Sequence, residues 1–383
     1  MKLLSSLAIL VSATIASAAA VAKSSPEKRW FPIAPKVVLI SMFAPEDVWT
    51  SPLGLTENIT LPGLSQLYPN VTCNPSGSVC HVTTGEAEIN AACTISALVL
   101  SDDFDLRKTY FLIAGIAGVN PYVGTTGSVG LARYAYQFGI GYEIDARQMP
   151  ANWTTGFFLF DTDEPGQKPT QIYGTELFEL NANLRDVVFE YTKGVQLNDT
   201  ATAAAFRQKY GFAPANQPPS VVYGDVSTSD VWFSGSLLSE AVANYTLLWT
   251  NGTGNYAFTA EEDNATFEAM IRAHKAGRVD FARVILMRTA SDFDRAPPGL
   301  DSAYSLLEAP QDGFGPSIAN ILIAGKPIVE GILNNWDSTF APGIDPQEGW
   351  AYNSDDLHTL AELRKRNFRE YHAAQKRVAR MRR

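Results

Sequence analysis

The 383-residue sequence contains few of the residues from which metal sites are built. It has three cysteines and four histidines, and the histidines are too scattered for the ligand spacing of a metal centre. Charged residues make up 18% of the chain and hydrophobic residues 46%, which is typical of a globular protein with a sizeable core. We therefore expect a globular domain with no metal and no resident cofactor.

Long apolar segments are also missing beyond the N-terminus. Residues 1–22 hold one lysine, an apolar run at 3–15 and a small-residue end, the pattern of a secretory signal peptide. No later run approaches the roughly 18 to 20 apolar residues of a membrane helix. The sequence thus predicts a protein secreted or held in the cell wall or periplasmic space, without an integral membrane span. Residues 23–35 are expected to be a pro-segment or linker, with Lys28-Arg29 either a processing site or a solvated pair.

Cysteines and glycosylation sequons agree with an oxidising compartment. Cys73 and Cys80 flank a turn signal at 74–77, so a disulfide between them is plausible. Cys93 is expected to be a buried small apolar residue. The sequons expected to carry glycans are those of Asn58, Asn70, Asn152, Asn198, Asn244 and Asn251. A seventh, at Asn264, conflicts with the ligand site considered below.

Negative charge dominates the body of the chain. The net charge is −10 although residues 364–383 hold nine Lys or Arg and one Glu, so the remainder is strongly acidic. An acidic body argues against nucleic-acid binding. Residues 346–383 form a basic tail, either a contact for an anionic surface or a solvated terminus.

Residues 110–147 form a glycine-rich stretch around which the chain is organised. The run at 110–114 has the length of a buried strand, and Gly115-Ile116-Ala117-Gly118 is expected to be a turn at its end. The glycines fit neither G-x-G-x-x-G nor a P-loop. Because ligands bind beyond the carboxyl ends of strands in open α/β sheets, we expect a binding crevice here.

Strand and helix patterns alternate along the rest of the chain, which predicts an α/β fold of three layers, α/β/α, with a mixed, mainly parallel central sheet. Strands are expected at 36–41, 81–84, 221–223 and 281–289. Helices are expected up to residue 100, at 175–191, at 198–210, from 264 to about 277, at 317–324 and at 327–336. The domain is expected to span residues 36–345.

Several residues near these strand ends could carry chemistry or could be structural. Glu46 and Asp47 follow the first strand and could act as acid or base or cap a helix. Trp232 and Phe233 could stack on a flat base or belong to the core. Asp292 follows the strand at 281–289, in the best position in the chain for chemistry.

Taken together, these segments resemble the purine nucleoside permease family of fungi and bacteria, which in turn resembles the purine nucleoside phosphorylase and nucleosidase superfamily. The resemblance covers about residues 36–345, and the longest match is GIAGVNPYVGTTGSVGLARYAYQFGIGYEIDAR. Shorter motifs are similar to those of the phosphorylases in the same order: residues 37–48, 84–92, 115–118, Ser229-Asp230-Val231-Trp232, Glu261-Glu262-Asp263 and Thr289-Ala290-Ser291-Asp292.

The resemblance implies roles for the matched positions. Asp292 would hydrogen-bond or protonate N7 of a purine, and Glu46 or Asp47 would position the nucleophile. Trp232 would stack on the base with Phe233 behind it. Glu262 would accept hydrogen bonds from the ribose hydroxyls, and the adjacent Asp263 is also expected at the substrate-binding site. Gly115, Ala117 and Gly118 would line the sugar and nucleophile site.

The resemblance leaves three functions open. Ile116 replaces the serine of the phosphorylase turn, and no arginine pair for phosphate is evident, although Arg133 and Arg147 are available. Phosphate is therefore a conceivable co-substrate, and water is at least as good a nucleophile. The chain could be a secreted enzyme that cleaves purine nucleosides for salvage, a binding protein that assists a separate permease, or a transporter, which the hydropathy disfavours. Family resemblance also makes a homo-oligomer conceivable.

Overall fold

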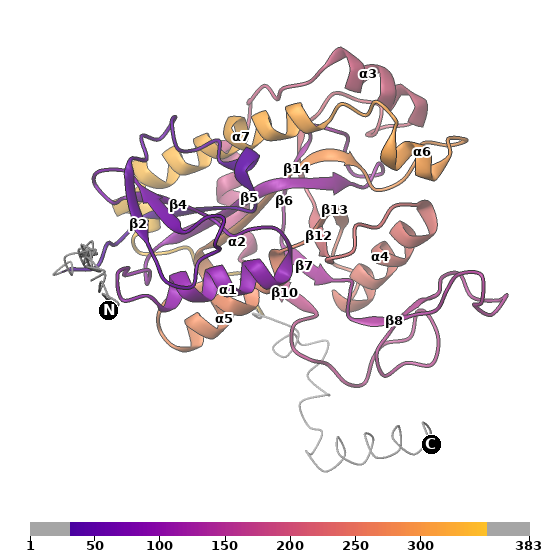
Figure 1. Cartoon of the computed structure of the whole chain (residues 1–383), viewed down its shortest axis with the longest axis horizontal. Helices are drawn as coiled ribbons and strands as arrows, with labels where there is room; N and C mark the ends of the chain where they lie inside the picture. The colour runs from indigo at the N-terminus through magenta and orange to yellow at the C-terminus, as the bar shows by residue number, and fades with distance from the viewer. Residues whose placement is uncertain (1–30, 351–383) are drawn as a thin grey trace, which may run out of the picture. The chain divides into compact units, whose positions relative to one another are not determined.

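The computed structural model describes residues 31–350, and its centre is one large β-sheet (Figure 1). The strands of this sheet are β1 (Val37–Ser41), β2 (Glu57–Thr60), β3 (Asn70–Cys73), β4 (Val79–Thr83), β5 (Tyr110–Val119), β6 (Val129–Leu131), β7 (Tyr134–Gln137), β10 (Leu177–Glu179), β11 (Val221–Tyr223), β12 (Asp225–Thr228), β13 (Tyr256–Ala260) and β14 (Val284–Phe293). A separate hairpin pairs β8 (Gly141–Glu143) with β9 (Phe157–Leu159).

Helices and helical turns connect the strands. The α-helices are α1 (Ala87–Leu100), α2 (Ala182–Tyr191), α3 (Ala201–Arg207), α4 (Ser236–Trp249), α5 (Asp263–Lys275), α6 (Ser302–Leu307) and α7 (Phe314–Asn334). The short turns are η1 (Ala44–Glu46), η2 (Gln208–Tyr210), η3 (Phe281–Arg283) and η4 (Trp336–Phe340).

Most strand pairings in the centre of the sheet are parallel. β1 pairs in parallel with β4 and β5, β5 with β14, and β12 with β7 and β13. Antiparallel pairings occur toward the edges, at β2–β3, β3–β4 and β7–β10, and also where β13 joins β5 and β6 joins β14. The predicted mixed sheet is confirmed.

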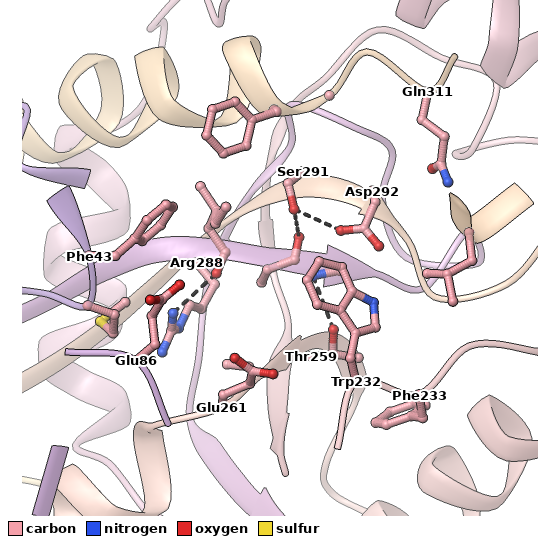
Figure 2. A pocket seen from close by; sticks show the side chains of 18 of the residues that line it. Phe43, Glu86, Trp232, Phe233, Thr259, Glu261, Arg288, Ser291, Asp292 and Gln311 are labelled. Atoms are coloured by element: carbon pink, nitrogen blue, oxygen red, sulfur yellow. Dashed lines mark hydrogen bonds between the residues drawn. The ribbon is translucent and has the colours of Figure 1, made fainter. Parts of the chain in front are cut away.

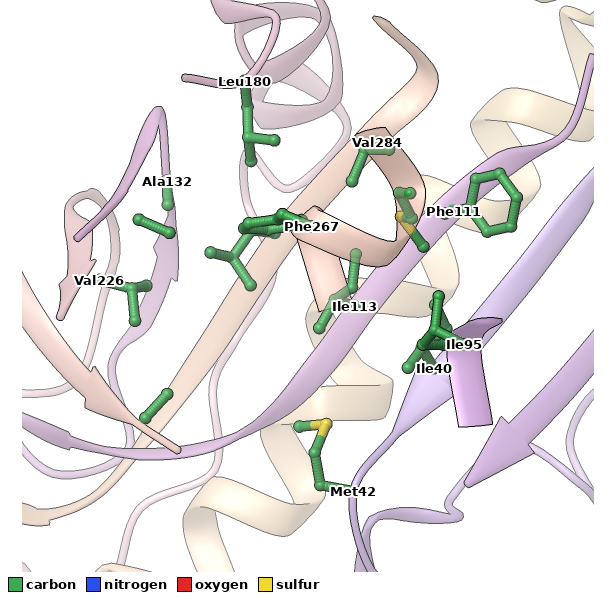
Figure 3. Close-up of a cluster of buried hydrophobic side chains, with 14 of the residues drawn as sticks. Ile40, Met42, Ile95, Phe111, Ile113, Ala132, Leu180, Val226, Phe267 and Val284 are labelled. Atoms are coloured by element: carbon green, nitrogen blue, oxygen red, sulfur yellow. The ribbon is translucent and has the colours of Figure 1, made fainter. Parts of the chain in front are cut away.

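Helices cover both faces of this sheet, as the prediction of three layers requires. One apolar cluster joins α1 and α5 to the sheet through residues such as Ile95 and Phe267, and Figure 3 shows these side chains beside Ile40 and Ile113. A second cluster places α7 and α2 on the opposite face. Burial of the apolar surface in these two clusters, at about 25 cal/mol per Å², stabilises the packing of the layers.

The expected glycine turn at residue 115 is wrong, because this residue lies inside strand β5. The strand continues through Gly115 and Gly118 to Val119, because β14 pairs with it along nearly its whole length. The glycines serve close packing instead: a Cβ on Gly115 would lie 1.9 Å from Cε of Met42, and one on Gly118 would lie 2.5 Å from Oγ1 of Thr259.

Two expected helices had the wrong bounds, and one expected burial was wrong. The helix expected at 175–191 begins only at Ala182, because the Asn181 side chain caps it by accepting from the Leu184 amide and residues 177–179 join the sheet as β10. The two helices expected at 317–324 and 327–336 are one helix, α7, which continues through Pro327 because its buried face packs on β14 and β5. Cys93 is exposed rather than buried.

Cys73 and Cys80 form the expected disulfide, on neighbouring strands β3 and β4. Of the predicted glycan carriers, Asn70 is half-buried and the others are exposed. Asn264 differs, because its side chain is buried in α5 and Nδ2 donates to the carbonyl of Thr175 at 2.8 Å. A glycan on Asn264 is therefore incompatible with this fold.

Among the described residues, α7 alone is a helix long and apolar enough in composition to cross a membrane. Within its 18-residue apolar window, 56% of the helix is buried, and its apolar side packs on the sheet, as in the core helix of a globular domain. The signal peptide, the Lys28-Arg29 pair and nearly all of the basic tail lie outside the described residues.

Candidate functional site

A cavity of about 620 Å³ opens where β1, β5 and β14 end (Figure 2). Its volume lies within the range of small-molecule pockets, and its place beyond the carboxyl ends of parallel strands is where α/β sheets bind ligands. Its acidic lining residues are Glu46, Glu86, Glu261, Glu262, Asp292 and Asp312, its cation is Arg288, and its rings are Phe43, Trp232, Phe233 and Phe314.

Glu46 reaches the cavity from the turn η1, directly after β1. Its carboxylate accepts two backbone N–H groups, from Met42 to Oε2 and from Ile116 to Oε1, each at 2.7 Å. Burial raises the pKa of Glu46 to about 7, against the opposing effects of Arg288 and of these two amides. A carboxyl group with a pKa near neutrality is suited to accept a proton from a nucleophile.

Gly115 provides the space in which Glu46 sits. A Cβ at this position would come within 2.6 Å of Oε1 of Glu46 and 2.9 Å of Nη1 of Arg288. Any side chain at residue 115 would therefore displace both functional groups. Gly115 itself does not line the cavity, and its neighbours Ile116, Ala117 and Gly118 do.

Arg288 is the buried cation of the site and is 2% exposed. Its Nη2 donates to Asp263 at 2.5 Å and to Glu262 at 3.1 Å, and its Nη1 donates to the carbonyl of Ile116 at 3.1 Å. Although burial lowers its pKa, the paired carboxylates raise it above the usual value. Arg288 thus fixes two acidic side chains from the start of α5, and its own charge is already compensated.

Glu262 is held at both carboxylate oxygens. Oε2 accepts from Arg288, and Oε1 accepts from the backbone N–H of Ala87 at 3.1 Å, at the start of α1. Each oxygen retains a lone pair for a further donor. Asp263, the residue after Glu262, is fully buried and does not line the cavity.

Asp292 occupies the opposite wall, where a bulge between Ala290 and Asp292 re-aims the end of β14. Its Oδ1 accepts from the Ser291 hydroxyl at 2.7 Å, and Figure 2 shows this pair facing into the cavity. Burial raises the pKa of Asp292 to about 6, with Asp294 adding to the shift and the Ser291 hydrogen bond opposing it. Asp292 therefore retains its proton at mildly acidic pH.

Aromatic side chains form the rim and one side wall. Trp232 is 62% exposed at the rim, whereas Phe233 is buried and packs against Phe138 with ring centroids 5.2 Å apart. Phe43 and Phe314 approach each other to 6.5 Å from opposite elements. An exposed indole over a cavity offers a flat face to a flat ligand.

Further carboxylates lie near the mouth of the cavity. Glu261 has its pKa raised to about 7 by burial and by the neighbouring charges of Glu262, Asp230 and Glu86. Figure 2 shows Glu86 and Glu261 on the same side of the cavity as Arg288. The mouth is therefore acidic as well as the interior.

The structure does not bring every predicted residue into the cavity. Asp47 points the other way, where its carboxylate accepts from the Thr50 hydroxyl at 2.8 Å and lies 3.5 Å from Nδ1 of His81. Arg133 pairs with Glu179 and Arg147 with Asp145, and neither arginine lines the cavity.

Sequence reasoning missed several lining residues. Arg288 was hidden inside an apolar strand pattern, and the Asp263–Arg288 pairing that explains it joins residues 25 positions apart. Glu261 was visible only as part of an acidic helix start. Phe43 and Phe314 are brought together by the packing of α7 over η1, which no local pattern encodes.

Fold and cavity together define an α/β protein with an acidic, aromatic-rimmed pocket for a small molecule. The sequence matches the family described as purine nucleoside permease over residues 34–345. It is 44% identical over 314 residues to the purine nucleoside permease of Candida albicans, covering 81% of this chain and 77% of that protein. It is 38% identical over 347 residues to a probable purine nucleoside permease of Schizosaccharomyces pombe, covering 88% and 98%. The chain belongs to the purine nucleoside permease family.

Solved structures that are similar to this chain include a nucleosidase and a hydrolase. One is a 5′-methylthioadenosine/S-adenosylhomocysteine nucleosidase from Colwellia psychrerythraea in complex with adenine, with a TM-score of 0.46 and 15% identity, covering 78% of this chain and 97% of that one. Another is futalosine hydrolase of Helicobacter pylori, with a TM-score of 0.45 and 12% identity, covering 77% and 97%.

Proposed function

We propose that the cavity binds a purine nucleoside and cleaves its N-glycosidic bond with water. The observation that carries this proposal is the pair of carboxyl groups with raised pKa values, Asp292 and Glu46, which line one cavity from two different strand ends. A pair of groups whose environments shift their pKa values toward neutrality is what general acid–base chemistry requires.

Each group then has a defined task. Asp292 gives its proton to N7 of the purine, so the base leaves as a neutral molecule when the C1′–N9 bond breaks. Glu46 accepts one proton of the attacking water, whose oxygen forms the new bond to C1′. The carboxylate of Glu262 accepts from the ribose hydroxyls and stabilises the positive charge that develops on the sugar. Transfer of the proton from Glu46 back to Asp292 through solvent restores the starting state.

The charge of the cavity favours water over phosphate as the nucleophile. Arg288 is the cation of its lining, and Asp263, Glu262 and the carbonyl of Ile116 already occupy it. A phosphate dianion beside Glu46 would face several carboxylates without a free positive partner. Even two unit charges of the same sign repel by about 4 kcal/mol at 4 Å and an effective dielectric constant of 20.

A second function, nucleoside binding in support of uptake, is favoured by the family name that the chain's relatives carry. It uses the same cavity and the same aromatic rim but requires neither Asp292 nor Glu46 as a proton carrier. The signal-peptide pattern and the sequons support a location outside the cell for either function. Glycosylated protein in the culture supernatant or wall extract is the expected result of fractionation.

Two neighbouring residues on one turn provide a matched test. Glu46→Gln keeps the shape of the side chain but removes the proton acceptor, so nucleoside cleavage should fall by about 10² to 10⁴. Asp47→Asn is the control, because its carboxylate lies outside the cavity, and its loss of activity should be far smaller. Equal losses in the two variants, or cleavage that survives Glu46→Gln, would contradict the proposed role of Glu46. A wild-type chain that binds nucleosides and leaves them intact would support the binding function.

A further inference from the structure

A buried chain of polar side chains lies behind the cavity and ends at Glu46. Nε2 of His81, on β4, lies 3.0 Å from Oγ of Ser41, at the end of β1. Oγ of Ser41 lies 3.1 Å from the backbone carbonyl of Glu46. Nδ1 of His81 lies 3.5 Å from Asp47, the residue after Glu46. Two neighbouring strands and the turn η1 are therefore joined by one set of polar contacts.

The directions of these hydrogen bonds follow from their geometry. The Ser41 hydroxyl has one proton, which it can give to His81 or to the carbonyl of Glu46 but not to both. The separation of 3.5 Å between His81 Nδ1 and Asp47 exceeds an ordinary N–H···O hydrogen bond. Placing the imidazole proton on Nε2 satisfies both short contacts, because His81 then donates to Ser41 and Ser41 donates to Glu46.

The arrangement has the residue types of a Ser–His–Asp triad, but it cannot act as one. A nucleophilic serine must be open to its substrate, whereas Ser41 is 0% exposed and does not line the cavity. The same chain ends on the backbone of a residue that does line the cavity. The Ser41 and His81 contacts can therefore act only by holding Glu46 in position.

We propose that Ser41 and His81 are positioning residues for Glu46, fixing the turn that delivers its carboxylate to the amides of Met42 and Ile116. Within η1, the backbone contacts of Glu46 are a bond from its N–H to the carbonyl of Phe43 and one from the N–H of Val48 to its own carbonyl, and the Ser41 hydroxyl adds a side-chain contact to that same carbonyl. This inference rests on the proposed function insofar as Glu46 is the proton acceptor there.

A displaced Glu46 changes two measurable properties. Misplacing a reacting group by about 1 Å can lower turnover about a hundredfold without loss of substrate binding. The pKa of Glu46 also depends on its place, because the amides of Met42 and Ile116 lower it while burial and Glu262 raise it and Arg288 lowers it. Weaker amide contacts should raise the pKa of Glu46, which lowers the productive fraction and moves the maximum of the pH–rate profile to higher pH, because that maximum lies midway between the pKa values of Asp292 and Glu46.

Ser41→Ala is the central test, with Thr109→Val as its matched control. Both variants remove a buried hydroxyl that donates to a backbone carbonyl, and the Thr109 bond, to Pro35 at 2.6 Å, lies at the opposite end of the sheet. Ser41→Ala should lower kcat by about tenfold to a hundredfold, leave KM within about twofold, and move the maximum of the pH–rate profile to higher pH. Thr109→Val should lower Tm to a similar extent and change neither kcat nor the pH of the maximum.

His81 supplies a second, independent pair of variants. His81→Gln keeps a donor near the position of Nε2 and should retain most activity, whereas His81→Leu keeps the volume without a donor and should resemble Ser41→Ala. The double variant Ser41→Ala with His81→Leu should lose no more activity than either single variant, because the two residues act through one contact. Additive losses would overturn the inference.

A readout without catalysis separates this inference from the proposed function. Hydrogen–deuterium exchange of peptides covering residues 42–46 and Ile116 should be faster in Ser41→Ala than in Thr109→Val, whether or not the chain cleaves nucleosides. If wild type cleaves nucleosides and Ser41→Ala behaves like Thr109→Val in kcat, pH profile and exchange, the positioning role is wrong and the function stands. If wild type does not cleave, the proposed function fails, and the exchange alone decides the positioning role.

Discussion

The pH dependence of cleavage follows from the pKa values of Asp292 and Glu46. The productive state needs a proton on Asp292, with a pKa of about 6, and none on Glu46, with a pKa of about 7. At pH 6.5 independent titration leaves roughly 6% of the free protein in that state. We expect kcat/KM to be highest near pH 6 to 7, to fall below this range as Glu46 gains its proton, and to fall above it as Asp292 loses its own.

Substitution of Asp292 by Asn should remove the fall of kcat/KM at high pH. Asn keeps the side-chain shape and an oxygen that accepts from Ser291, so nucleoside affinity should stay within about tenfold, whereas loss of the acid should lower the maximum by about 10² to 10⁴. That loss equals about 3 to 5 kcal/mol in the barrier. The profile of Asp292→Asn should rise through the pKa of Glu46 and then stay level.

The assay is kcat/KM for inosine between pH 4.5 and 9, by separation of free base from nucleoside, with affinity measured independently by dialysis. Turnover that is unchanged in Asp292→Asn would remove this residue from the chemistry. A falling alkaline limb that persists in the variant would assign that limb to another group and refute the reasoning from the raised pKa.

Three other changes test separate parts of the account. Trp232→Ala should weaken purine affinity by about 1 to 3 kcal/mol if the ring stacks on the base, with an unchanged Tm because the side chain is largely exposed; equal affinity in wild type and variant would leave Trp232 without a ligand role. Gly115→Ala should abolish cleavage and lower stability by about 1 to 3 kcal/mol, because the new Cβ meets Met42 and Glu46; a stable, active variant would contradict the packing at this position. Glu46→Gln should also change how stability depends on pH. Because folding raises the pKa of Glu46 from 4.5 to about 7, the contribution of protonated Glu46 to the free energy of unfolding is present below pH 4.5 and is lost, by about 3 kcal/mol, as pH rises through 7. Chemical denaturation should therefore show a smaller loss of stability in the variant than in wild type over this interval.

Local patterns in the sequence predicted the helices and strands whose structure depends mainly on residues adjacent in the chain. The apolar run at 37–40 is a strand because its residues prefer that conformation and both faces are buried. The helix that starts at Asp263 was visible from its acidic start and apolar face. Strand β5 was predicted too short, because pairing with β14 outweighs the tendency of Gly115 and Gly118 to end a strand.

The sequence likewise predicted some residues of the candidate site and missed others. Asp292 and Glu46 were expected because each follows a strand, and strand ends gather at one edge of a sheet. Asp47 stands beside Glu46 in sequence, and only the fold decides which of the two carboxylates enters the cavity. The role of Arg288 depends on contacts with Asp263 and Glu262 across the sheet, and such contacts leave no local signal.

Product analysis of the purified wild-type chain, free of membranes, decides whether the cavity cleaves nucleosides with water. Adenosine, guanosine and inosine would each be incubated with and without inorganic phosphate, and the products separated. We expect free base and ribose to form at the same rate with and without phosphate. Ribose 1-phosphate formed only in the presence of phosphate, or intact nucleoside in every sample, would contradict it.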